Sequence, residues 1–141
     1  MIEELKKQIE TLETLIRSHK HQGVGSEKMN SGITTVLMSF ETGEQTATKI
    51  YFPFAVKILK IRGIVMKAIA ATNNGTITGA NLDGDSASGV ITATASDALN
   101  VEYSVSPTSN FEVGQGSYYK LTSAKTTAGG KVLVTLEWER L

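Results

Sequence analysis

Apolar residues near the start of the chain recur in alternating steps of three and four, which is the spacing of positions a and d in a heptad. These residues are Ile2, Leu5, Ile9, Leu12 and Ile16. Glu, Lys and Gln occupy many of the positions between them, and all three favour helix. A helix this short is marginal alone in water, so the pattern predicts a coiled-coil oligomerisation helix over residues 1–21.

Leu15 widens the apolar stripe of this helix, because it falls at heptad position g. Ile at position a with Leu at position d favours a parallel dimer, whereas a wider stripe suits a larger bundle. The pattern leaves dimer and trimer open. It predicts self-association through six side chains, which are Ile2, Leu5, Ile9, Leu12, Leu15 and Ile16.

A glycine-rich stretch follows the helix. Residues 22–32 include Gly23, Gly25 and Gly32 and fit neither a helical nor a strand period. We interpret them as an extended linker that leads into one body over residues 33–141.

Residues 33–141 alternate between apolar and polar side chains, with turn residues between the alternating segments. Four sets should point into a core, namely Val36, Met38 and Phe40; Ile50, Phe52 and Phe54; Val101, Tyr103 and Val105; and Val132, Val134, Leu136 and Trp138. About eight strands result, which suits a sandwich or a jelly roll. The predicted fold class is mainly β: a short N-terminal coiled-coil helix followed by an antiparallel, jelly-roll-like β-sandwich.

The segment from Val56 to Ala71 has two interpretations. Ile58, Ile61 and Val65 would share one face of a helix, so a helix is a real alternative. β-Branched residues dominate the segment, however, and Gly63 would weaken a helix at its middle. We therefore expect two strands or one bent strand.

Two histidines lie where the predicted helix ends, in Ser18-His19-Lys20-His21. Continuing the heptad places His19 at position d, on the axis, and His21 would project to the same side of an extended chain. In a trimer, His19 and His21 would supply an axial site for a divalent transition-metal ion shared by three chains, because such ions accept six imidazole nitrogens. The alternative is a pair of solvated histidines with nothing bound, and we expect no other cofactor to be required.

Composition narrows the function classes. The 14 basic and 14 acidic side chains cancel, so the chain lacks the positive charge that nucleic acid would demand. Cysteine is absent, which excludes disulfides and thiolate chemistry. The start of the chain resembles neither a signal peptide nor a membrane span, so we expect synthesis in a cytoplasm and no membrane insertion.

Candidate catalytic groups are sparse. The body contains no histidine, so it cannot build a Ser-His arrangement, and we expect no enzyme activity and assign no catalytic residues. Several carboxylates fall in turns or on predicted solvent faces, namely Asp83, Asp85, Asp97, Glu102, Glu112 and Glu137. Tyr118, Tyr119 and Trp138 could form a platform for sugar or partner contact, but Tyr119 and Trp138 fit the core better.

The stretch Ile16-Arg17-Ser18-His19-Lys20-His21-Gln22-Gly23, with Ser26-Glu27-Lys28-Met29-Asn30 behind it, resembles the His-x-His-x-Gly stretches of tailed-phage fibre proteins. The resemblance covers residues 1–32 best. It implies a homotrimer wound about one axis, with His19 and His21 of three chains holding an axial metal ion.

The body resembles the small jelly-roll heads of phage head-fibre and capsid-decoration proteins, in the stretches Ala47–Phe54 and Tyr119–Val132. This implies a non-enzymatic virion structural protein, made in the host bacterial cytoplasm, that attaches to phage capsid or tail proteins. The alternative is a tail-fibre or receptor-binding module that recognises host-surface carbohydrate through loops such as Asn81–Gly89 or Ser106–Gln115.

Overall fold

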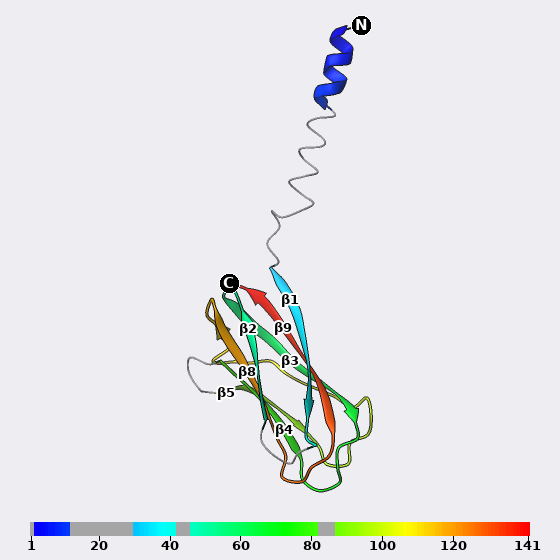
Figure 1. Cartoon of the computed structure of the whole chain (residues 1–141), viewed down its shortest axis with the longest axis vertical. Coiled ribbons are helices and arrows are strands. Elements are labelled where there is room, and N and C mark those ends of the chain that lie inside the picture. Colours follow the sequence, from blue (N-terminus) through cyan, green and yellow to red (C-terminus); the bar gives the residue numbers. More distant parts are fainter. Residues whose placement is uncertain (1, 12–29, 42–45, 82–86) are drawn as a thin grey trace.

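The computed structural model describes residues 2–11, 30–41, 46–81 and 87–141, and these form one helix and nine strands (Figure 1). The helix covers residues 2–11. The strands are β1 (Ser31–Ser39), β2 (Thr46–Phe52), β3 (Val56–Lys67), β4 (Gly75–Asn81), β5 (Ala87–Ala93), β6 (Glu102–Val105), β7 (Glu112–Val113), β8 (Ser117–Ala124) and β9 (Lys131–Arg140). The predicted mainly β class, with a helix only near the N-terminus, is confirmed for these residues. Strand β1 begins at Ser31, two residues before the predicted start of the body at residue 33.

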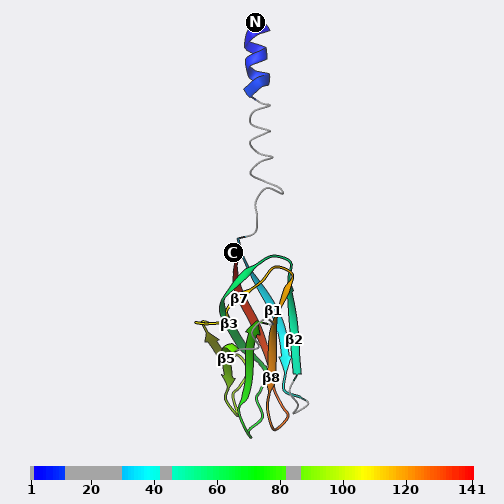
Figure 2. The ribbon, with the colours of Figure 1, turned by 90° about the vertical axis from the view of Figure 1, so that its left-hand side faces the viewer.

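The strands form two antiparallel sheets that lie face to face (Figure 2). Sheet A has the order β1-β9-β3-β6, with β7 also paired to β3, and sheet B has the order β2-β8-β4-β5. Strands pair in a nested way: β1 with β9, β2 with β8, β3 with β6 and β4 with β5. A nested set of four pairs, folded over into two sheets, is the strand order of a jelly roll.

The core fills the space between the sheets. Alternation along each strand directs one set of side chains inward, as in Lys131–Arg140, where burial alternates residue by residue. The four predicted inward-facing sets all belong to the core or pack against it. The Trp138 ring lies 5.8 Å from the Phe52 ring and 5.6 Å from the Phe54 ring, and its indole nitrogen donates a hydrogen bond to Thr34.

The segment with two interpretations is a single strand, β3, so the strand interpretation is confirmed. Its pairing with β9 shifts register between Ile58 and Lys60 and again between Val65 and Lys67, which are β-bulges. Each bulge adds one residue to the interval between inward-facing side chains. The first bulge makes the interval from Ile58 to Ile61 three residues, whereas Ile61 and Val65 are related by regular alternation through the buried Gly63, and together these intervals give the helix-like spacing.

The two ends of the body's chain lie together. Strands β1 and β9 pair from Ser31↔Glu139 to Ser39↔Lys131, and the Arg140 amide donates to the Asn30 carbonyl at 2.6 Å. The amide of Leu141 donates to Ala55 at 3.0 Å. Strand β1 thus begins beside the last residues of the chain (Figure 1).

Close approach of the two sheets depends on Gly79 of β4, which faces inward. A Cβ atom at this position would overlap the buried Tyr119 hydroxyl and lie 2.8 Å from Cδ1 of Ile61 in the opposite sheet. Interiors are packed too densely to absorb such an overlap without displacement.

Replacement of Gly79 by alanine is expected to lower the free energy of unfolding by about 1–3 kcal/mol, because overpacking forces side chains off their rotamers. Thr78→Ala, on the outward side of the same strand, is the matched control and should change it by less than about 0.5 kcal/mol. Urea denaturation measures both. Equal stability of the two variants would show that the sheets can separate freely at this point.

Candidate functional site

The N-terminal helix presents an unpartnered apolar stripe. Ile2, Leu5 and Ile9 are 76%, 62% and 53% exposed, and with Lys6 they line a groove of about 240 Å³. Helix-favouring residues surround them, and the Thr11 hydroxyl donates to the Lys7 carbonyl within the helix. Three of the six predicted oligomerisation residues therefore share one exposed face.

The remaining predicted site residues belong to the part of the chain outside the described ranges. They are Leu12, Leu15 and Ile16 of the stripe, and the proposed metal ligands His19 and His21. No group of three or more His, Asp or Glu side chains arranged to hold a metal ion occurs in the described parts of the chain.

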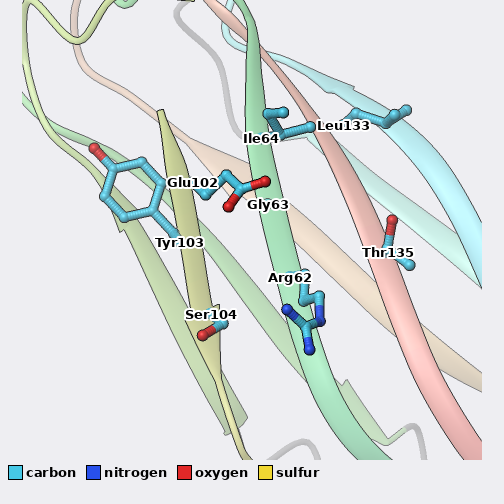
Figure 3. A pocket seen from close by; sticks show the side chains of 8 residues that line it. All are labelled: Arg62, Gly63, Ile64, Glu102, Tyr103, Ser104, Leu133 and Thr135. Atoms are coloured by element: carbon cyan, nitrogen blue, oxygen red, sulfur yellow. The ribbon is translucent and has the colours of Figure 1, made fainter. Parts of the chain in front are cut away.

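An apolar row crosses the outer face of sheet A. Leu37 of β1 lies opposite Leu133 of β9, which lies opposite Ile64 of β3. Figure 3 shows Ile64 and Leu133 on their neighbouring strands, above Arg62 and Thr135. An open groove of about 360 Å³ occupies the β9, β3 and β6 part of this face and is lined by Arg62, Gly63, Ile64, Glu102, Tyr103, Ser104, Leu133 and Thr135.

Two ion pairs flank this row. The Arg62 guanidinium donates to the Glu137 carboxylate, with 2.8 Å between Nε and Oε1. The Lys67 ammonium lies 2.9 Å from Oε1 of Glu41, and its hydrogen bond holds the pKa of that carboxyl below its usual range. Both pairs are partly solvated, so they contribute little to stability. They do balance charge locally on both sides of the row.

The outer face of sheet B has a different character. Threonines occupy much of it, as where Thr78 lies opposite both Val90 and Thr122. Tyr51 and Tyr118 lie opposite each other near one end, with ring centroids 5.4 Å apart, and both are exposed. Polar and amphipathic side chains of this kind are compatible with water.

The predicted aromatic platform divides between surface and core. Tyr119 is fully buried and Trp138 is 6% exposed, which confirms the core assignment for both, while Tyr118 is at the surface. Desolvation by burial raises the pKa of Tyr119 to about 12, only partly offset by the neighbouring Ser88 hydroxyl. Tyr119 therefore stays neutral at physiological pH and behaves as a packing residue.

The candidate carboxylates do not converge. Asp83 and Asp85 lie outside the described residues. Asp97 accepts the amide of Thr94 within a turn, Glu137 is paired with Arg62, and Glu102 and Glu112 are exposed. Paired carboxylates that could act as acid and base are therefore not seen among the described residues. In the same residues, no helix is both long and apolar enough to cross a membrane.

The apolar row on sheet A and the tyrosine pair on sheet B were not predicted from the sequence pattern. A signal for the row was present, because Leu37 lies between Val36 and Met38, and Leu133 between Val132 and Val134. Strands that are apolar on both faces are typical of sheets covered on both sides. The tyrosine pair depends on strand pairing over a long sequence distance.

No family model matches the chain, and no curated protein matches it. Similar solved structures include a chain of tomato aspermy virus, with a TM-score of 0.47, 10% identity, and coverage of 94% of this chain and 95% of that chain. A chain of the cyanophage Pam1 capsid has a TM-score of 0.45 and 14% identity, covering 84% of this chain and 92% of that chain.

The Drosophila NLP core, described in terms of pentamer formation and histone binding, has a TM-score of 0.42 and 12% identity, covering 77% of this chain and 98% of that chain. Fold does not assign function, so the function must be inferred from this chain's own residues.

Proposed function

We propose that this chain is a non-enzymatic structural protein of a phage particle, a capsid-decoration or head-fibre protein that assembles as a homotrimer through its N-terminal helix. The observation that carries the proposal is the exposed stripe of Ile2, Leu5 and Ile9. A helix with large aliphatic side chains at heptad spacing is stabilised in water when partner helices bury those side chains. The helix is also too short to be stable alone.

A trimer is favoured over a dimer by two features of the sequence. Leu15 at heptad position g widens the stripe beyond a two-stranded contact. Residues 16–23 resemble the His-x-His-x-Gly stretches of trimeric phage fibres. Three jelly-roll bodies would then be held on one stalk.

A role on the particle fits the chemistry of the body. The body offers a compact sandwich, no histidine and no converging carboxylates in its described part. Jelly rolls serve as shell and attachment domains in viral capsids and as binding domains in lectins. Repeated copies on a capsid or tail would bind firmly through many weak contacts.

Light scattering of the purified chain should give three times the single-chain mass of 15.1 kDa at micromolar concentration. Ile9→Asp places a charge in the stripe and should reduce the mass to that of a monomer, because a buried unpaired charge is costly. Lys7→Asp, at the outward heptad position f, is the control and should remain trimeric. A monomeric natural chain would contradict the proposal.

The proposal extends to an axial metal ion held by His19 and His21 of three chains. Six imidazole nitrogens suit an octahedral divalent transition metal. Elemental analysis of the trimer peak should find one ion per three chains, and His19→Ala should abolish it. A trimer without metal would retain the structural role and remove the metal site.

Recognition of host-surface carbohydrate is the second candidate function. The observation that favours it is the exposed Tyr51–Tyr118 pair, since aromatic rings with a polar edge suit sugar contacts. A glycan array should then show binding that Tyr51→Ala removes and that Thr92→Ala, also exposed on sheet B, does not. Absence of glycan binding would leave only the assembly role.

A further inference from the structure

We propose that the outer face of sheet A is a second contact between copies of this chain, centred on the row of Leu37, Leu133 and Ile64. This inference rests on the proposed oligomerisation and adds to it. The helices would join the chains, and the sheet faces would then fix how the bodies sit against one another.

The outer face of sheet A carries more exposed aliphatic side chains than the outer face of sheet B. Ile33 and Leu37 of β1 are 68% and 54% exposed, and Met66 at the second bulge of β3 is 49% exposed. On the outer face of sheet B, by comparison, Val90 is the one large aliphatic side chain that is exposed among the described residues. A solvated sheet face normally carries polar side chains, so clustered aliphatic residues indicate a covered surface.

The bulges of β3 add to this surface. Leu59 and Met66 are the extra residues at the two register shifts, and each is an exposed aliphatic side chain. A bulge can redirect a side chain that regular pleating would place elsewhere. Met66 extends the apolar surface beside the row, whereas Leu59, like Ile33, lies at the level of Glu137 and forms a separate apolar area beyond the Arg62–Glu137 pair.

The charges on this face favour a second copy over a strongly acidic or basic partner. Arg62 is paired with Glu137 and Lys67 with Glu41, so these groups are already neutralised within one chain. They lie on either side of the apolar row along the strands, and the exposed Glu102 of β6, opposite Ile64, lies at the end of the row. An apolar centre with a polar, charge-balanced rim is the usual anatomy of a contact between protein subunits.

The position of β1 supplies a further reason. Among the described residues it is the first strand after the N-terminal helix along the chain, and it is an edge strand of sheet A. Joining the helices of several chains raises the effective concentration of whatever follows them. The aliphatic residues Ile33 and Leu37 are among the first body residues that would meet in such an assembly.

The test uses the absence of cysteine from the natural chain. Leu37→Cys and Val90→Cys are made separately in the full chain; both positions face outward on edge strands and are 54% and 44% exposed. In the assembled protein, a maleimide should modify Cys at position 37 at least about tenfold more slowly than Cys at position 90, since reaction requires access to the thiol. Equal rates in a protein of trimeric mass would overturn the inference and leave the helix-driven assembly intact.

Ile9→Asp is then added to the Leu37→Cys chain. If the mass falls to that of a monomer, the labelling rate at position 37 should rise to that of position 90. A rate that stays slow would mean that the chain covers this site itself, which overturns the inference.

If the Ile9→Asp protein remains assembled, Leu37→Asp is combined with Ile9→Asp. Dissociation would then support the sheet contact, and persistent assembly would overturn it. A monomeric natural chain would remove both proposals, and light scattering detects that case first.

Discussion

Pairing of β9 with both β1 and β3 is the constraint on which the body depends. Strand β9 lies between β1 and β3 in sheet A, so β1 has no neighbour in that sheet, and β3 is paired only with β6 and β7, until β9 is in place. The register of these pairs decides which side chains enter the core. A slip of one residue would turn Val132, Val134 and Leu136 outward and bring Leu133 into the core.

The same register creates the two surfaces of sheet A. Inward, it aligns β-branched and aromatic residues against sheet B; outward, it aligns Leu37, Leu133 and Ile64 across three strands. Strand β9 is apolar on both sides at its centre, as a central strand between two covered faces would be. The strands of sheet B are not apolar on both faces in this way, because threonines alternate with their inward residues.

Local patterns were enough to predict much of the body. Alternation identified Val36, Met38 and Phe40, and likewise the inward residues of β9, because a period of two depends only on neighbouring residues. The helix-like spacing in β3 was ambiguous because bulges alter that period, and β-branched composition favoured the correct interpretation. Register between distant strands cannot be obtained from such patterns, so the apolar row and the Tyr51–Tyr118 pair were not predicted. The heptad predicted a coiled-coil seam that includes Ile2, Leu5 and Ile9; these side chains are exposed on the helix, and their role in self-association stays a prediction.

The hydrogen bonds that join Asn30 to Arg140 and Ala55 to Leu141 place the entry and exit of the body's chain at one end. A polypeptide fused after Leu141 would therefore leave the body beside the strand that continues from the N-terminal segment. The opposite end, where the loops between β3 and β4 and between β8 and β9 meet, would remain unobstructed. Cargo intended for display away from the entry of the N-terminal segment therefore belongs in those loops, since a fusion after Leu141 would lie beside that entry.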